Sequence, residues 1–259
     1  MNKKPKILLV DLETAPMRAY VWQRWDVNVA MNQLISGSDL LTWSAKWLDD
    51  DTTYYDALYL HKKHYKKHPE CDKMIVDTLW DMMDEADIVI AHNGDRFDIP
   101  VMNARFLAHD MVPPSQYQTV DTLKIARRVF KLTSNRLDDL GDYLGVGRKI
   151  DTGGFKLWRD IVEDGCMTAF KDMLDYNIQD VALLESVYLK LRKWDKRHAS
   201  VATLSDPDKP ECNVCGSTKL VKNGSYSTNT QVYQKYKCVC GHNMRARKRQ
   251  QRRHTLVSN

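Results

Sequence analysis

Apolar residues occur in two patterns along this chain, as short continuous runs and as longer segments in which they recur every three or four positions. The runs at residues 6–10 and 87–91 are typical of strands that are buried on both faces. Residues 40–48 and 52–58 are rich in Trp, Tyr, Leu and Thr around an Asp-Asp-Asp turn, which predicts a β-hairpin. The pattern therefore predicts buried strands together with an antiparallel pair.

Helical spacing of apolar residues predicts helices over residues 72–85, from about Phe97 onward, over 134–144 and over 167–191. In the last segment six apolar residues share one face: Leu174, Ile178, Val181, Leu184, Val187 and Leu191. Strands that alternate with helices, with a hairpin near the start, predict an α/β fold built on a mixed sheet flanked by helices.

One segment has the composition of a linker. Residues 199–210 contain small residues, Ser and two prolines. They predict a boundary between a first domain, residues 1–198, and a small second domain, residues 211–259.

The formal net charge of +5 is distributed unevenly. Residues 211–259 hold ten Lys or Arg and one acid, Glu211, so this part carries +9 and residues 1–210 carry −4. An acidic body with a basic tail fits a carboxylate-rich catalytic domain joined to a module that binds a polyanion. The alternative is a solvated tail that only maintains solubility.

The composition, 43% hydrophobic and 28% charged, is that of an ordinary soluble protein. No run of eighteen or more apolar residues occurs, and the short basic N-terminus leads into a charged strand rather than into the apolar region of a signal peptide. We therefore expect an intracellular, cytoplasmic protein with no membrane partner.

Four of the six cysteines lie close together near the C-terminus: Cys212, Cys215, Cys238 and Cys240. In a reducing compartment such a cluster predicts a metal site rather than a set of disulfides. Cys71 and Cys166 stand alone and are expected to be inert thiols.

Three short patterns contain the candidate catalytic residues. Asp11 and Glu13 lie at the end of the first strand at positions i and i+2, which project from the same face. Asp98 lies where the second strand gives way to a helix, at the sheet edge where such folds bind ligands. Tyr176 and Asp180 are at positions i and i+4 of the last helix and share a face.

Four carboxylates brought together would repel one another, and some would bind protons. Two hard divalent cations, Mg²⁺ or Mn²⁺, resolve this repulsion because carboxylate and water oxygens are their preferred ligands. Two such ions about 3.5–4 Å apart can stabilise both the attacking and the leaving oxygen of a phosphodiester displacement. The pattern therefore predicts a two-metal site.

These patterns resemble the motifs of a known family. The sequences DLET at 11–14, NGDRFD at 93–98 and YNIQD at 176–180 resemble the three motifs of the DEDD (DnaQ-like) exonucleases, in the subgroup with a tyrosine in the third motif. The resemblance covers roughly residues 5–195 and implies an RNase H-like fold. It also implies a 3′→5′ exonuclease that hydrolyses phosphodiester bonds.

The resemblance implies a role for each motif residue. Asp11 would bridge both metal ions, Glu13 and Asp180 would complete the site of the ion that activates water, and Asp98 would hold the second ion. Tyr176 would orient the attacking water through its hydroxyl group.

Other residues of the motifs are implied in substrate binding. Glu13 and Thr14 would contact the 3′-terminal nucleotide, Asn93 would brace the second motif, and Phe97 would contribute to the same substrate site.

Residues 120–123 and 137–145 resemble the segment that connects the second and third motifs. Asp121 in this segment is at best an indirect contributor, because an Asp followed by Thr is equally a helix N-cap. His92 and Asp95 adjoin the second motif and fit either the cleft or a solvated loop.

Three histidines and two tryptophans have competing interpretations. His61, His64 and His68 have spacings that allow metal binding on a helix, but they lie among lysines, which favours a solvated segment. Trp22 and Trp25 could stack on a terminal base, although packing is the commoner role of tryptophan.

The spacing Cys212-x2-Cys215, then twenty-two residues, then Cys238-x-Cys240 is typical of a zinc ribbon with one structural Zn²⁺. The segment resembles small zinc ribbons of transposase-type and phage DNA-handling proteins. Its second knuckle departs from the usual spacing, which leaves His242 as an alternative ligand to Cys240.

We expect the ribbon to bind nucleic acid. Tyrosines and lysines alternate along it, and arginines follow, so that both stacking faces and phosphate contacts are present: Lys222, Tyr226, Tyr233, Lys235, Tyr236, Lys237 and residues 245–253. The ribbon favours DNA over RNA, a role in replication or repair, and a bacterial or phage source. An RNA exonuclease and a non-catalytic binding protein remain the alternatives, and nothing in the sequence supports a polymerase partner.

Overall fold

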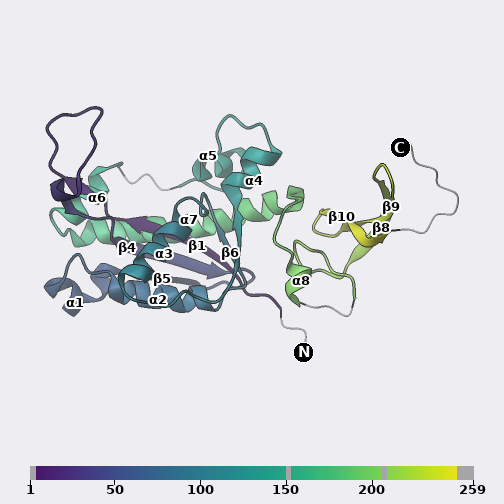
Figure 1. Cartoon of the computed structure of the whole chain (residues 1–259), viewed down its shortest axis with the longest axis horizontal. Coiled ribbons are helices and arrows are strands. Elements are labelled where there is room, and N and C mark those ends of the chain that lie inside the picture. Colours follow the sequence, from purple (N-terminus) through teal and green to yellow (C-terminus); the bar gives the residue numbers. More distant parts are fainter. Residues whose placement is uncertain (1–3, 150–152, 206–208, 250–259) are drawn as a thin grey trace.

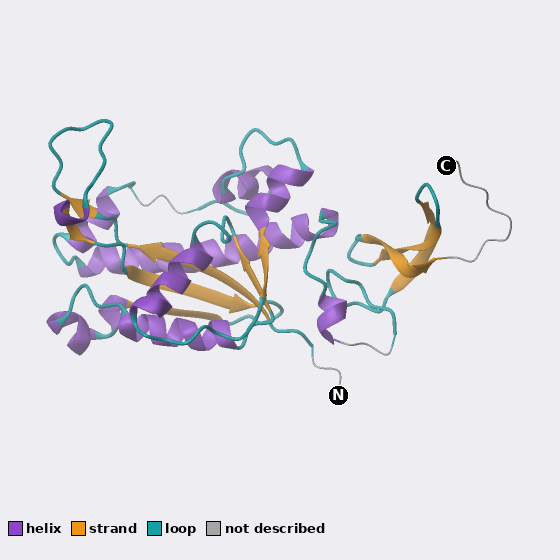
Figure 2. Cartoon of the chain, viewed as in Figure 1, coloured by secondary structure: helices purple, strands orange, loops and turns teal. Residues whose placement is uncertain are grey.

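The computed structural model describes residues 4–149, 153–205 and 209–249. These residues form a five-stranded mixed sheet covered by helices and a separate three-stranded sheet near the C-terminus (Figures 1 and 2). The predicted fold class, a mixed α/β sheet flanked by helices, is confirmed.

The central sheet has the strand order β5-β4-β1-β6-β7. Its strands are β1 (Ile7–Thr14), β4 (Leu40–Trp47), β5 (Thr53–Ala57), β6 (Ile88–Ala91) and β7 (Gln118–Asp121). Strands β1, β6 and β7 are parallel, whereas β4 and β5 form the predicted hairpin and run antiparallel to their neighbours.

The helices cover both faces of this sheet. Their bounds are α1 (Lys62–Lys67), α2 (Lys73–Asp84), α3 (Asp98–Ala108), α4 (Thr122–Val129), α5 (Leu137–Tyr143), α6 (Lys156–Val162), α7 (Met167–Leu191) and α8 (Val201–Ser205). The helices predicted from apolar spacing are confirmed as α2, α3, α5 and α7. Helices α1, α4, α6 and α8 were not predicted. Two short strands, β2 (Arg18–Ala19) and β3 (Leu34–Ser36), form a small separate ribbon.

Alternation along β1 decides which way its acids point. Leu8 and Val10 are buried in the cluster that includes α2, α3 and the start of α7, and Leu9 is buried in the cluster that includes the C-terminal half of α7. Asp11 and Glu13 continue the Leu9 series and therefore project from the face toward α7. A register shift of one residue would exchange the two faces and place both carboxylates among apolar side chains.

Strand β1 includes both acids near its C-terminal end. It continues through Thr14, so that Asp11 pairs with Ser44 and Glu13 pairs with Thr42 across the β1–β4 ladder. The acids thus lie on a strand that is hydrogen-bonded to its neighbour. This arrangement holds their backbone rigidly.

The C-terminal sheet has the order β10-β9-β8 and is antiparallel throughout. It consists of β8 (Leu220–Ser227), β9 (Val232–Cys238) and β10 (Asn243–Arg249). In Figure 1 it lies beyond the end of α7. We call residues 211–249 the ribbon module.

Hydrogen bonds connect the ribbon module to the chain that precedes it. The Nδ1 atom of His242 lies 2.9 Å from the backbone oxygen of Lys193, and the backbone N–H of Val201 donates to the oxygen of Asn213 at 2.9 Å. Val201 is buried and belongs to helix α8, which lies inside the predicted linker 199–210. Residues 206–208 of that linker lie outside the described ranges, and the domain boundary stays a prediction.

Within the described ranges, none of the helices combines the length and the hydropathy needed to cross a membrane.

Candidate active site

Three carboxylates meet between β1 and α7. One side-chain oxygen each of Asp11, Glu13 and Asp180 lies within 4.8 Å of the other two. Asp180 lies in the middle of α7 and is buried, because α7 packs against β1. The predicted first and third motifs are therefore adjacent in space.

Asp98 approaches the same place from the start of α3. Its side chain is 2% exposed. Burial, followed by the charge of Asp11, raises the pKa of Asp98 well above its usual value. Asp98 is not among the three carboxylates whose oxygens cluster most tightly. Its carboxylate nevertheless interacts with the charge of Asp11.

The turn before α3 fixes the position of Asp98. Asn93 has a left-handed backbone, with φ at 68°, and a Cβ atom on Gly94 would lie 2.4 Å from the Cβ of Ala91. The N–H of Asn93 donates to Oδ1 of Asp121 at 3.0 Å, and the same oxygen accepts from the N–H of Leu123 at 2.9 Å. Asp121 is thus the N-cap of α4, and it also anchors the second motif.

The protonation of these acids reflects their crowding. Burial, with the charge of Asp180, raises the pKa of Asp11 to about 7, and burial, with the charges of Asp11 and Asp180, raises the pKa of Glu13 to about 8. Burial also raises the pKa of Asp180. Without a cation, the cluster therefore retains protons near neutral pH.

Lys149 is a member of this site that the sequence did not reveal. Its ammonium group donates to Oδ2 of Asp180 and, at 2.9 Å, to the hydroxyl of Tyr176. Burial alone would lower the pKa of Lys149, but the charge of Asp180 and these hydrogen bonds outweigh burial and raise it. No spacing rule indicates Lys149, because it lies outside α7, 27 residues before its partner Tyr176.

Asn177 is a second site residue that was not predicted from the sequence. It is 0% exposed, and its Nδ2 donates to Oδ2 of Asp11 at 2.7 Å. Its Oδ1 accepts from the hydroxyl of Thr42 at 3.3 Å. A signal was present in the sequence, since Asn177 is a polar residue between Leu174 and Val181 on the apolar face of α7.

The proposed substrate-binding residues lie around the carboxylates. Thr14 ends β1, and Phe97, which is 41% exposed, precedes Asp98. Burial raises the pKa of Tyr176 to about 12, so its hydroxyl stays protonated in the physiological range. The side chains of Trp22 and Trp25 do not pack into a core, since they are 98% and 73% exposed.

The histidines take structural positions. His92 lies 2.9 Å from the hydroxyl of Thr122 and 3.0 Å from the oxygen of Asn135, and burial lowers the pKa of His92 to about 4. His61 lies 2.8 Å from a carboxylate oxygen of Asp56. In the described part of the chain, the three histidines at 61, 64 and 68 do not assemble into a group of metal ligands.

The four C-terminal cysteines form a second group that could hold a metal ion. Their sulfur atoms lie within 4.8 Å of one another, with 3.8 Å between Cys212 and Cys240 and 3.6 Å between Cys215 and Cys238. Cys240 therefore belongs to the group. His242 instead lies on the Lys193 backbone oxygen.

Comparison with known proteins places the chain in a family. The family model of the RNase H superfamily matches residues 47–192. The chain belongs to the RNase H superfamily. Nucleases of this superfamily use divalent metal ions, and membership supports a nuclease here. The matched range includes Asp98, Tyr176 and Asp180 but begins after Asp11 and Glu13.

A solved structure supports the same fold. The family B DNA polymerase from the hyperthermophilic archaeon Pyrobaculum calidifontis is similar, with a TM-score of 0.50 and 13% sequence identity. The similarity covers 79% of this RNase H superfamily member and 27% of the polymerase chain. No curated protein sequence matches the chain.

Proposed function

We propose that this protein is a metal-dependent 3′→5′ exonuclease that removes nucleotides from the 3′ end of single-stranded DNA. One observation carries the proposal most directly. Asp11, Glu13 and Asp180 bring carboxylate oxygens within 4.8 Å of one another, and Tyr176 shares the Lys149 ammonium group with Asp180. This donor set fits hard divalent cations and a phosphodiester substrate.

The carboxylates fit two Mg²⁺ or Mn²⁺ ions. Oδ1 of Asp98 and Oδ1 of Asp180 are buried and have no hydrogen-bond partner among the described residues, so both are available as ligands. In the proposed assignment Asp11 binds both ions, Glu13 and Asp180 bind one, and Asp98 binds the other. When bound, such ions activate water and stabilise the leaving oxygen.

The chain's own residues would orient the reaction. Tyr176 orients the attacking water through its protonated hydroxyl, and Asn177 holds Asp11 in one orientation through the 2.7 Å hydrogen bond. Thr14, Asn93 and Phe97 are the proposed contacts of the 3′-terminal nucleotide.

The ribbon module would contain one structural Zn²⁺. In a tetrahedral site with Zn–S bonds of about 2.3 Å, neighbouring sulfur atoms lie about 3.8 Å apart. The Cys212–Cys240 and Cys215–Cys238 distances of 3.8 and 3.6 Å agree with this value. Such a small module has little core of its own, so the metal would supply on the order of 10 kcal/mol to its folding.

The product ladder of a 5′-labelled single-stranded DNA tests the proposed reaction. With Mg²⁺ or Mn²⁺, labelled products should shorten one nucleotide at a time, and chelation should stop the reaction. Asp180→Asn should abolish cleavage, whereas Asp175→Asn, an exposed position on the same helix, should not.

A matched RNA of the same sequence separates the alternatives. Preferential shortening of the RNA would make the protein an RNA exonuclease. If both polymers bound but neither was cleaved with either metal ion, the non-catalytic binding protein would replace the enzyme.

A further inference from the structure

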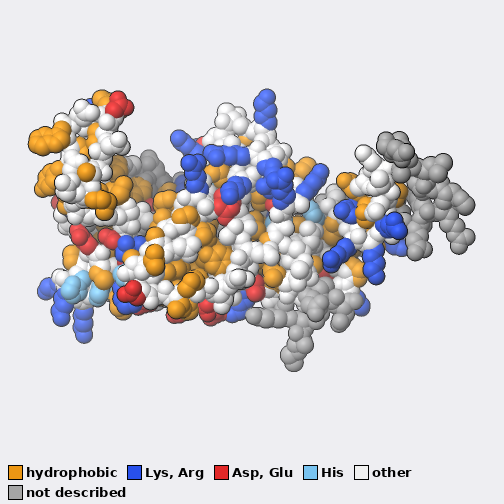
Figure 3. Space-filling view, in the orientation of Figure 1, with side chains coloured by type: hydrophobic (Ala, Val, Ile, Leu, Met, Phe, Trp, Pro, Cys, Tyr) orange, Lys and Arg blue, Asp and Glu red, His pale blue; other side chains and the backbone are white. Residues whose placement is uncertain are grey.

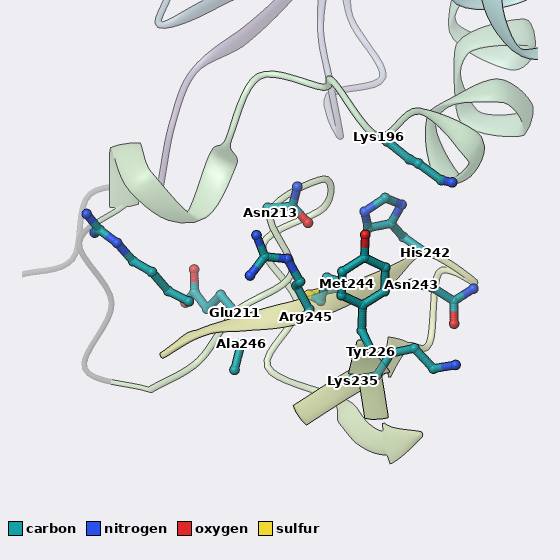
Figure 4. Close-up of a pocket in the computed structure, with 11 residues that line it drawn as sticks. Lys196, Glu211, Asn213, Tyr226, Lys235, His242, Asn243, Met244, Arg245 and Ala246 are labelled. Carbon is teal, nitrogen blue, oxygen red and sulfur yellow. The ribbon is translucent and has the colours of Figure 1, made fainter. Parts of the chain in front are cut away.

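A pocket of about 700 Å³ lies between the ribbon module and the end of the first domain, away from the carboxylates. Figure 4 shows that Lys196 reaches it from the chain segment after η3 (Arg192–Trp194), whereas its other labelled residues belong to the ribbon module. The pocket therefore exists only where the two parts meet. The His242–Lys193 contact holds them together at this point.

The charge of the pocket suits an anion. Lys196, Lys235, Arg245 and Arg247 line it, and Glu211 is the one acid among its lining residues. Glu211 already accepts a hydrogen bond from Ser205 at 2.8 Å. The four cationic side chains of the pocket can therefore bind a phosphate group.

The pocket also offers groups that recognise a nucleobase. Tyr226, which is 47% exposed, presents its ring beside Arg245, whose guanidinium carbon lies 5.7 Å from the ring centre. Oδ1 of Asn213 is buried and has no hydrogen-bond partner among the described residues. An aromatic face together with a free acceptor fits a base that carries N–H donors.

Basic residues also gather on the first domain, over α4 and α5 (Figure 3). Figure 3 also shows Lys and Arg side chains on the ribbon module. The exposed residues of the first group are Lys124, Arg127, Arg128, Lys131, Arg136 and Arg148. Arg128 forms a 2.6 Å ion pair with Asp195, the residue directly before Lys196, so α4 lies next to the chain segment that reaches the pocket.

We propose that the pocket binds one nucleotide of the same strand whose 3′ end occupies the candidate active site. Arg245, Arg247 and Lys196 bind its phosphate, and Tyr226 and Asn213 contact its base. The inference rests on the proposed exonuclease function and adds a second, distant binding site for its substrate.

The geometry predicts a minimum strand length. Eleven residues of α7 separate Asp180 from Leu191, which is about 17 Å of helix, and η3 adds a few ångströms. A stacked strand advances about 3.4 Å per nucleotide, so roughly six nucleotides are needed to connect the two sites. Shorter strands should reach only the active site.

Two double variants with the same change in charge test the pocket. Lys235→Glu with Arg247→Glu alters residues that line it, whereas Lys209→Glu with Lys219→Glu alters exposed residues of the same part of the chain that do not. The measurement is kcat/KM of the full chain on single-stranded DNA of 3 to 16 nucleotides. For the unchanged protein and the control variant, kcat/KM should increase at least about tenfold once the strand is longer than roughly six nucleotides.

The pocket variant should lose this gain while it cleaves the shortest strands as fast as the unchanged protein. Its binding to long strands should also depend less on salt, by about 0.7 units of log–log slope for each lost phosphate contact. If the pocket variant loses bound metal from its cysteines, the milder pair Lys235→Gln with Arg247→Gln replaces it.

Three results would overturn the inference. The increase of kcat/KM on long strands could be reduced as much in the control variant as in the pocket variant, which would indicate general charge attraction. The pocket variant could keep the full gain. A nucleoside monophosphate could abolish the gain at a concentration equal to that of the long strand, which would indicate a site for free nucleotides. Absence of cleavage at every length, with length-dependent binding preserved, would instead refute the exonuclease function alone.

Discussion

Nδ2 of Asn177 donates a hydrogen bond to Oδ2 of Asp11 over 2.7 Å and so connects α7 directly to β1 at the centre of the candidate active site. The same side chain accepts from Thr42 on β4. Helix α7 therefore contributes Asp180 to the carboxylate cluster and also fixes the orientation of the acid on the neighbouring strand. Both contacts come from a position that is completely buried.

Replacement of Asn177 by Ala should lower kcat by about 10- to 100-fold and leave KM nearly unchanged, because Asp11 would lose its fixed orientation. The Asn177 hydrogen bond lowers the pKa of Asp11, so its loss should also move the pH–rate profile to higher pH. Single-turnover rates between pH 6 and 9 measure both effects. A lower melting temperature with an unchanged pH profile would indicate a purely structural role.

Lys149 competes with a metal ion for Asp180, because its ammonium group donates to Oδ2 of that residue. At pH 8.5, where fewer protons compete for the carboxylates, the Lys149→Met variant should therefore bind Mn²⁺ more tightly than the unchanged protein does. Calorimetric titration of the metal-free protein measures the change. Arg148→Met is the matched control, since Arg148 is exposed and pairs with Asp142. Equal or weaker Mn²⁺ binding by Lys149→Met would contradict this view.

A site residue could be predicted from the sequence only where a local pattern marks its position. The alternation of β1 and the apolar face of α7 are local patterns, so the positions of Asp11 and Asp180 were predictable. The contact of Lys149 with α7 depends on the path of a turn between α5 and α6, which has no periodic signal. Asn177 was detectable in principle, as a polar interruption of an apolar face.

Two further misses have simple physical reasons. Helix α4 has only eight residues, and although its apolar and polar faces are clearly separated, the pattern extends over about two turns, which is too short for a helix to be predicted from spacing. Its N-cap, Asp121, was the better clue. Helix α8 lies in a segment whose prolines suggested a linker, but Val201 in it is buried against the first domain. Arg252 and Arg253 of the predicted basic tail lie outside the described residues.

The raised carboxylate pKa values predict a stability that depends on pH and on metal. The folded, metal-free protein binds more protons than the unfolded chain between about pH 4 and pH 8, since the pKa values of Asp11 and Glu13 are about 7 and 8 when folded. Its stability should therefore fall as pH rises through this range. Mn²⁺ should stabilise the protein progressively more over the same range.

Asp11→Asn should accordingly raise the melting temperature of the metal-free protein at pH 8 by a few degrees, have no such effect at pH 4, and abolish activity. Thermal melts at both pH values with and without Mn²⁺ measure this. The control is Asp175→Asn, which removes a charge from an exposed position. An equal rise at pH 4 would show that the effect does not arise from the raised pKa of Asp11.

Removal of metal from the cysteines should unfold the ribbon module without stopping the chemistry. The four sulfur atoms surround a common point, and apart from them the small cluster includes only Val214, Leu220 and Met244, so the module cannot replace the lost metal with core packing. A strong chelator with excess Mg²⁺ added back, or the variant Cys215→Ser, should make the remaining cysteines reactive to thiol reagents. It should also abolish the gain in kcat/KM on long strands.

Cleavage of strands shorter than roughly six nucleotides should continue at the original rate, because β1 and α7 have their own core. Thiol titration and the short-strand assay on one sample compare the two parts directly. If cleavage of the shortest strands stopped together with exposure of the thiols, the ribbon module would be required to hold α7 in place, and the independence of the two parts would be refuted.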